Sequence, residues 1–339
     1  MTIHNNTVLI EPVKMAEKLS TILQKYGFEE KKAGKCADIF TNSSLDGIYT
    51  HGINRFIRFV DYIKKGIIRP DAEPTLKRKA GNMEQWDGNL GPGPLNAVVA
   101  TDRAIELAME GGIGCVALSN TNHWMRGGSY GWQAARKGFA FIGFTNTIAN
   151  MPAWGAKDQK LGNNPLVIAI PYKEEAIVLD MAMSQYSFGA MEMAVIKKEN
   201  LAYQGGFDRT GNLTNNPSAI IASRRPLPIG YWKGAGLSLL LDILAALLSG
   251  GLSTKEISKK EVEQAVSQVF IVIDLIQLGE SSIINRTIQE IIDDYLQSVP
   301  QDERTRISYP GQRVIETRIK NLEAGIPVLN EVWEQVLSL

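Results

Sequence analysis

Two of the three histidines in this chain of 339 residues stand where a side chain could move a proton. His51 lies in GIYTHGINRF and His123 in SNTNHWMRGGSYG, each among glycine and small polar residues. Histidine ordinarily titrates near neutral pH, which suits it to general acid or base catalysis. A histidine that only holds a loop through a hydrogen bond would give the same pattern, so the neighbouring residues must separate the two interpretations.

Arg55 lies four residues after His51 and favours the catalytic interpretation of that histidine. Positions four apart share one face of a helix, and a guanidinium group binds a carboxylate through two parallel hydrogen bonds. A proton donor beside a carboxylate anchor is what the reduction of a 2-keto acid requires. An arginine on a solvated helix face is the plain alternative. We predict that His51 moves the proton and that Arg55 holds the anion.

The groups that suit a phosphate-bearing cofactor are of an unusual kind. No G-x-G-x-x-G occurs, so the ordinary dinucleotide-binding fingerprint is missing. In PIGYWKGAGLS, Lys233 lies among glycines before an apolar helix, where backbone N–H groups and an ammonium group suit a pyrophosphate. A glycine-rich turn without a ligand explains the same pattern. Asp180 ends the apolar strand AIVLD, where it could orient a ligand or an imidazole, or cap the next turn.

Whole-chain features exclude several classes of function. Lysine plus arginine and aspartate plus glutamate each number 36, which argues against nucleic acid or an anionic membrane as a partner. No H-x-x-x-H or C-x-x-C is present, so no metal site is predicted. The longest apolar stretch, from Leu237, is interrupted by Asp242 and predicts a buried helix, and no secretory signal is evident. We therefore expect a soluble, cytoplasmic protein.

The elements that must position these residues follow from the apolar periodicity. Helices are predicted near both ends of the chain and strands in its middle, which indicates an α/β or α+β fold with more than one lobe. The segment 206–225 is rich in turn residues and predicts a loop. The expected helices are 12–27, 31–45, 52–65, 94–110 and one from Leu237, and the expected strands are 114–118, 139–145, 166–172, 176–181 and one from Gln268.

Six stretches, in this order, resemble the malate/L-lactate dehydrogenase-like oxidoreductases: YTHGINRF, SNTNHWMRGGSYGWQAA, TNTIANMPAWGAK, GNNPLVIAIP, VLDMAMSQYSFG and GYWKGAGLSLLLD. The resemblance runs from about Pro12 to the last predicted helix. It implies a non-Rossmann NAD-binding domain over 76–279, with a largely antiparallel mixed sheet and a helical insertion. It also implies a helical domain in which 1–75 packs with 280–339, and a homodimer with the active site near the subunit interface.

The resemblance further implies roles for single residues. His51 and His123 each match a histidine that has the proton-transfer role in a member of the family, and we favour His51 as the proton donor. Thr50 stands where many members have serine, and with Arg55 and Asn122 it is predicted to bind the substrate. The wording YPGQR near the C-terminus departs from the family's usual Pro-Gly-Glu type. The cofactor is predicted to contact Asp180, Met181, Ala182, Met183, Ser184, Trp232, Lys233, Gly311, Gln312 and Arg313.

These roles combine into a predicted reaction, the reduction of a sugar-derived diketo acid at C2 with NADH. His51 donates the proton, Arg55 pairs with the C1 carboxylate, and His123 with Asn122 binds the hydroxylated tail or polarises the carbonyl group. NADPH stays open as the cofactor, because the acidic-residue rule belongs to Rossmann sites. Two other interpretations also stay open: the same chemistry on malate, lactate, ureidoglycolate or piperideine-2-carboxylate, and a non-catalytic protein that binds a sugar acid or a nucleotide.

Overall fold

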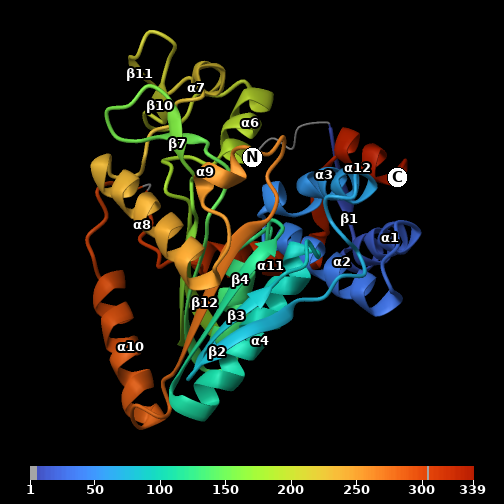
Figure 1. The fold of residues 1–339 in the computed structure, drawn as a ribbon. Coiled ribbons are helices and arrows are strands. Elements are labelled where there is room, and N and C mark those ends of the chain that lie inside the picture. The colour runs from blue at the N-terminus through green and yellow to red at the C-terminus, as the bar shows by residue number, and fades with distance from the viewer. Residues whose placement is uncertain (1–5, 304) are drawn as a thin grey trace.

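The computed structural model describes residues 6–303 and 305–339, and a seven-stranded sheet forms its centre (Figure 1). The strand order is β2-β3-β4-β12-β5-β8-β9, and among these strands only β3 and β4 run parallel. This arrangement confirms the predicted non-Rossmann domain with a largely antiparallel mixed sheet. The strands are β2 (Thr75–Ala80), β3 (Met83–Asp87), β4 (Ile113–Thr121), β5 (Phe139–Thr145), β8 (Leu166–Tyr172), β9 (Glu175–Met181) and β12 (Val266–Asp274).

Helices cover both faces of this sheet. α4 (Gly93–Gly111) and α5 (Gly128–Ala135) pack on one face, and α8 (Trp232–Ser249) packs on the other (Figure 1). The central strand β12 contains an unbroken apolar run from Val269 to Ile273, because its successive side chains point to opposite faces and both faces are covered. Phe270 accordingly joins the core under α4 and α5, whereas Val269 joins the core under α8.

The two ends of the chain form a helical lobe beside the sheet. β1 (Thr7–Ile10) pairs with β13 (Ile326–Leu329), and four helices pack around this strand pair. Their apolar stripes meet in one core, where Phe40 and Phe56 contact each other edge to face with ring centroids 5.2 Å apart. The four helices are α1 (Pro12–Lys25), α2 (Glu30–Leu45), α3 (Ile53–Lys64) and α12 (Asn330–Leu337).

Two further helices follow β12 along the sequence and precede β13, the last strand of the chain. α11 (Gln312–Ala324) packs against the helical lobe, whereas α10 (Ser281–Leu296) extends away from that lobe (Figure 1). The N- and C-terminal segments therefore meet in space through α11, β13 and α12. The domain limits themselves, 1–75 with 280–339 and 76–279, stay a prediction.

A third, smaller region at the top of Figure 1 contains α6, β10, β11 and α7 around a small core of its own. The predicted loop 206–225 is wrong in part, since it contains a short strand pair and α7 (Pro217–Ser223). Asn216 caps that helix by accepting the N–H of Ala219, and Pro217 occupies the first turn, so turn residues here start a helix. The other elements are α6 (Phe188–Lys197), β10 (Gly206–Phe207), β11 (Leu213–Thr214), β6 (Met151–Pro152), β7 (Gln159–Leu161), α9 (Thr254–Ile257) and the 3-10 turn η1 (Tyr49–His51).

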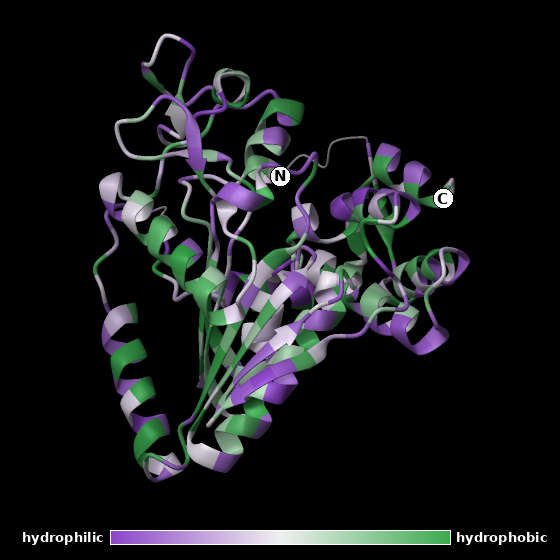
Figure 2. Cartoon of the chain, viewed as in Figure 1, coloured by the Kyte–Doolittle hydropathy of each residue, from purple (hydrophilic) through white to green (hydrophobic). Residues whose placement is uncertain are grey.

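α8 departs from the predicted buried helix, because only one of its faces packs on the sheet. Ala235, Leu241 and Ala245 belong to the core, whereas the outer face is exposed although it is strongly apolar (Figure 2). Within the described part of the chain, α8 alone is long and apolar enough to span a membrane by length and composition, and 33% of it is buried. The exposed apolar residues of its outer face are Leu239, Leu240, Ile243, Leu244 and Leu247.

Candidate active site

A cavity of about 1030 Å³ opens at one edge of the sheet, between the helical lobe and α6. His123 reaches it from the end of β4, and Asp180 from the end of β9. Alternate strands of an antiparallel sheet end at the same edge, which is why segments far apart in the sequence meet there. Of the residues predicted from the sequence, the cavity is lined by Thr50, His51, Arg55, His123, Asp180, Ala182 and Gly311.

A break in the backbone separates His51 from the helix that carries Arg55. η1 ends at His51, and α3 begins at Ile53, so the two side chains do not share one continuous helix as the sequence predicts. The hydroxyl of Ser44 accepts the N–H of Ile53 over 2.8 Å, and a Cβ atom at Gly52 would lie 2.8 Å from the backbone nitrogen of Ser44. Close packing against α2 therefore makes the break, yet both side chains still line the cavity.

The two candidate histidines face each other with nearly parallel rings. Their ring centroids are 5.8 Å apart, and their planes differ by 14°. Nδ1 of His123 accepts a hydrogen bond of 2.9 Å from the N–H of Met125, which leaves the proton of this ring on Nε2. Nδ1 of His51 lies 3.3 Å from the hydroxyl oxygen of Thr50. A second proton could enter His123 only by breaking a backbone hydrogen bond, and His51 has no such restraint.

Burial and neighbouring charges set the titration of both rings. Burial lowers the pKa of His51, the carboxylate of Asp180 opposes that shift, and the cations of Arg55 and Arg126 add to it. Burial, followed by the cation of Arg55, holds the pKa of His123 well below the ordinary value. Asp180 therefore distinguishes His51 as the ring that more readily gains a proton.

Arg55 presents a half-buried guanidinium group to the cavity without a protein partner. Within residues 6–303 and 305–339 its side chain forms no hydrogen bond and no ion pair. Burial lowers its pKa, the cation of Arg58 adds to that shift, and the carboxylate of Glu263 opposes it. An unpaired charge withdrawn from water is costly, so such a group favours an anionic ligand. This geometry suits the carboxylate anchor predicted at Arg55, a role that stays a prediction.

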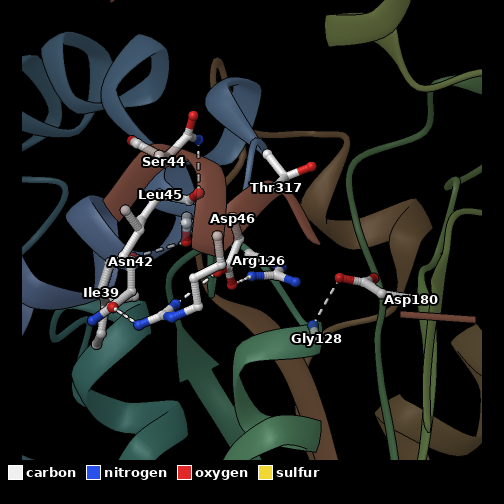
Figure 3. Close-up of polar contacts among 12 residues, drawn as sticks. Ile39, Asn42, Ser44, Leu45, Asp46, Arg126, Gly128, Asp180 and Thr317 are labelled. Atoms are coloured by element: carbon white, nitrogen blue, oxygen red, sulfur yellow. Dashed lines mark hydrogen bonds and ion pairs between the residues drawn. The ribbon is translucent and has the colours of Figure 1, made fainter. Parts of the chain in front are cut away.

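The loop that follows β4 holds Asp180 in place. Oδ2 of Asp180 accepts a hydrogen bond of 2.7 Å from the N–H of Gly128, at the start of α5 (Figure 3). A Cβ atom at Gly128 would lie 2.9 Å from that oxygen, so glycine permits this close approach. The carboxylate predicted to contact the cofactor is thus fixed at a helix N-terminus, where negative charge is favoured.

The first two segments predicted to contact the cofactor lie next to each other but differ in their access to the cavity. Ala182 lines it, and the chain beyond pairs with the segment before α8, where the N–H of Ile229 donates to the carbonyl of Met183 over 2.8 Å. Trp232 and Lys233 begin α8 and are exposed to solvent, outside the cavity lining. The two segments are therefore joined through the backbone.

In the third predicted segment, one residue of three lines the cavity. Gly311 precedes α11 with a φ of 93°, and a Cβ atom there would lie 3.1 Å from the backbone nitrogen of Val178. Both the backbone angle and the available space therefore favour glycine. Gln312 and Arg313 lie outside the cavity lining, and the side chain of Arg313 is exposed.

Asn122 lies behind the cavity wall, although it directly precedes His123. Its buried amide donates hydrogen bonds to the carbonyls of Leu90 and Gly91, over 2.9 and 3.1 Å. Successive side chains of an extended segment point in opposite directions, so only one of these two neighbours can face the cavity. The substrate contact predicted for Asn122 has no counterpart in this geometry. Met181, Met183 and Ser184 also lie outside the cavity lining.

Two charged residues of this region escaped the sequence analysis. Arg126 lines the cavity with a side chain that is 5% exposed, and its Nη1 donates to the carboxylate of Asp46. A charged residue inside the glycine-rich loop after His123 was the available signal for Arg126. Asp46 follows the predicted helix 31–45 and carries no local signal of its partner.

The cavity suits a nicotinamide ring together with a small acid. Its volume of about 1030 Å³ slightly exceeds the usual range of sites that bind one small molecule, about 300–1,000 Å³. Glycines at 128 and 311 keep the backbone open where a side chain would meet Asp180 or Val178. The residues present therefore fit the cofactor that the sequence predicts.

Comparison with known proteins identifies the family. A model of the family described as malate/L-lactate dehydrogenase matches residues 10–337, and the chain belongs to this family. The protein is accordingly an oxidoreductase that acts on CH–OH groups with a nicotinamide cofactor.

The curated relatives give a narrower likeness. The chain is 42% identical over 327 residues to the 2,3-diketo-L-gulonate reductase of Citrobacter koseri, with 96% of this chain and 98% of the relative covered. It is 43% identical over 326 residues to the protein of the same name from Pasteurella multocida, again with 96% and 98% covered. The wording NHWMRGGSYGWQAA followed by MPAWGAK resembles this reductase in particular, and the comparison confirms the resemblance.

Solved structures share the whole fold. The malate dehydrogenase from Entamoeba histolytica aligns with a TM-score of 0.92 at 25% identity, covering 98% of this chain and 97% of that one. The malate dehydrogenase from Pyrococcus horikoshii OT3 aligns with a TM-score of 0.90 at 28% identity, covering 100% and 96%. These likenesses extend over the sheet domain and the helical lobe together.

Proposed function

We propose that this enzyme reduces 2,3-diketo-L-gulonate to 3-dehydro-L-gulonate, with NADH as the cofactor and His51 as the proton donor. The observation that carries the proposal is the cavity, where the unpaired guanidinium of Arg55 lies on the same surface as His51 and His123. The relatives named 2,3-diketo-L-gulonate reductase support the choice of substrate.

Arg55 binds the C1 carboxylate of the substrate in this proposal. Its guanidinium can form two parallel hydrogen bonds with a carboxylate, and withdrawal from water strengthens both. The C2 carbonyl group is bonded directly to C1, so anchoring the carboxylate brings the reacting carbon to the imidazole rings. Arg58 lies on the same helix and lines the same cavity, where it adds positive charge.

His51 donates the proton to the C2 oxygen as negative charge develops there. The carboxylate of Asp180 favours the protonated ring, and the bound substrate adds a second negative charge nearby. His123 stays neutral with its proton on Nε2, because Nδ1 accepts the N–H of Met125. It therefore serves as a hydrogen-bond donor, either to the same oxygen or to a hydroxyl group of the sugar chain.

The cofactor supplies a hydride to the C2 carbon when it is bound. We propose that Asp180, Ala182 and Gly311 hold its nicotinamide end, because they line the cavity that contains the histidines. Trp232 and Lys233, at the N-terminus of α8, hold its phosphates, since the positive end of the helix dipole and an ammonium group favour an anion there.

The test is the loss of reduced-nicotinamide absorbance with NADH and with NADPH. It is run in parallel on 2,3-diketo-L-gulonate, pyruvate, oxaloacetate and piperideine-2-carboxylate. Rapid oxidation of NADH with the diketogulonate alone is the expected result. Preference for another acid would keep the mechanism and change the substrate. Tight cofactor binding without turnover of any acid would leave a binding protein instead of a reductase.

Reduction of oxaloacetate to malate is the second candidate, because the solved structures above are malate dehydrogenases. They share 25% and 28% identity with this chain, against 42% for the diketogulonate reductase of Citrobacter koseri. The substrate panel separates the two candidates directly.

We also propose that the enzyme is a cytoplasmic homodimer with α8 in its interface. The outer face of α8 exposes Leu240 and Leu247 to 57% and 70%, and exposed apolar patches on soluble proteins mark contact surfaces. In a two-fold dimer the same helix face can pack against its own copy. Light scattering after gel filtration should report a dimer for the wild type and a monomer for Leu244→Glu.

A further inference from the structure

One buried carboxylate, Asp46, joins three segments of the chain (Figure 3). Its Oδ2 accepts from Nη1 of Arg126, and its Oδ1 accepts from Nη1 of Arg318 over 2.6 Å. The side chains of Asp46 and Arg126 are 8% and 5% exposed, so this charge cluster is largely withdrawn from water. Nη2 of Arg318 also donates to the side-chain oxygen of Asn42 over 2.6 Å.

All three segments lead to the cavity. Asp46 follows α2 and stands five residues before His51. Arg126 lies in the cavity lining itself, three residues after His123. Arg318 lies in α11, the helix that begins beside the cavity. The cluster therefore fixes the segments of both histidines relative to the C-terminal part of the chain.

We propose that Asp46 is a positioning residue for the reaction: it holds Arg126 in the cavity wall and balances the charge of that guanidinium group beside His51. Asp46 is not part of the cavity lining, so it acts through Arg126 and not on the substrate. The inference rests on the proposed role of His51 as the proton donor.

The charges that act most strongly on His51 come from three elements, and Arg58, Glu192, Glu261 and Glu263 line the same cavity. Arg55 faces it from α3, Arg126 and His123 from the loop after β4, and Asp180 from the end of β9. Asp180 favours the protonated ring, whereas the two arginines disfavour it. A guanidinium group that loses its carboxylate partner becomes an uncompensated buried charge. Such a charge makes the neighbouring imidazole harder to protonate.

Asp46→Asn removes the charge and keeps the shape of the side chain. We expect kcat for keto-acid reduction to fall about tenfold to a hundredfold, because small displacements of catalytic groups have effects of that size. The pH at which His51 loses its proton should fall by about one unit, the scale of one uncompensated charge nearby. Since the protonated ring is the donor, the pH above which reduction slows should fall with it.

The titration of His51 is measured by NMR of the imidazole resonances, which requires no turnover. The chain has three histidines, so a His51→Gln spectrum suffices to assign the signal. Melting temperature and circular dichroism show whether each variant is folded.

Three further variants separate charge from packing. Arg126→Gln alone should raise the pH at which His51 titrates, and it tests the inference even if Asp46→Asn does not fold. Combining Asp46→Asn with Arg126→Gln should remove the downward shift, because no unpaired guanidinium remains beside the ring. Asp61→Asn is the matched control, since Asp61 pairs with Lys65 on the outer side of α3 with 45% of its side chain exposed, and it should change neither kcat nor the titration.

An unchanged His51 titration in folded Asp46→Asn, or in Arg126→Gln, overturns the inference even if activity falls. A merely structural carboxylate would lower the melting temperature without moving the titration. If the wild-type enzyme turns over no keto acid, the proposed function fails, whereas the titration still decides whether Asp46 governs the charge of His51.

Discussion

Two of the arginines that line the cavity differ in whether a carboxylate of the protein pairs with them. Arg126 shares the carboxylate of Asp46 with Arg318, whereas the side chain of Arg55 has no partner in the part of the chain that the structure describes. Withdrawal from water penalises both guanidinium groups. The difference teaches that the fold pairs the arginine that builds the cavity wall with a carboxylate, and that it leaves unpaired the arginine for which we propose a ligand.

The largest expected effect comes from Arg55→Met. We expect kcat/KM for the diketogulonate to fall about a thousandfold, because losing the partner of a buried carboxylate costs about 4 kcal/mol. Without substrate, the melting temperature should equal or exceed that of the wild type, since no native ion pair is broken. Arg55→Lys is the matched control, and it should lose less activity because it keeps the charge without the planar fork. A clear drop in melting temperature would show that Arg55 has a structural partner.

His51→Ala should have the next largest effect. Turnover should fall roughly a hundredfold or more, the usual scale of acid–base catalysis, while NADH binding followed by fluorescence stays intact. In the wild type, kcat/KM for reduction should be high below the pKa of His51 and decline above it, because the protonated ring is the donor. Near-normal turnover in the variant would remove the proposed role.

His123→Asn should cost only about tenfold in kcat, because one neutral hydrogen bond contributes at most about 1.5 kcal/mol. Its side-chain oxygen replaces Nδ1 as the acceptor for the N–H of Met125, and the donor at Nε2 is lost. The pH profile of reduction should not change, because His123 stays neutral over the working range. If His123→Asn lost the pH dependence of reduction and a His51 variant retained it, the proposed roles of the two histidines would be exchanged.

Gly311→Ala should have the smallest effect, on stability more than on turnover. Forcing a side chain onto a φ of 93° costs about 1–2 kcal/mol in the free energy of unfolding. The same change at Gly138, with a φ of 91° and nothing within 4 Å of the added Cβ, measures the backbone cost alone. The difference between the two variants in urea unfolding isolates the contact with Val178. Equal losses in the free energy of unfolding would mean that the chain near Val178 shifts to accommodate the added methyl group at little cost.

Much of the secondary structure could be predicted, but not the arrangement of the elements. The periodicity predicts a helix over 94–110 and a strand over 139–145, and α4 and β5 lie there. The strand order stayed open because β4 pairs with β12 through backbone groups that any apolar strand presents. The helix from Leu237 was predicted to be buried because it is apolar. Its outer face is nevertheless exposed, since apolar character alone does not tell which element covers a helix face.

The candidate site divides in the same way. His51, Arg55 and His123 could be found because residue types at short spacing carry the signal. The pairing of Arg126 with Asp46 could not, since 80 residues separate the partners. Helical spacing predicted His51 and Arg55 as a pair, and both side chains line the cavity although a break in the backbone lies between them.

The sequence by itself determined the family, the α/β class and the set of candidate residues, because each depends on local patterns in a recognisable order. Only the tertiary structure decided which nitrogen of His123 carries the proton, that Arg55 lacks a partner and that Arg126 has one. These properties depend on burial and on contacts between remote segments, and the folded chain alone creates that electrostatic environment.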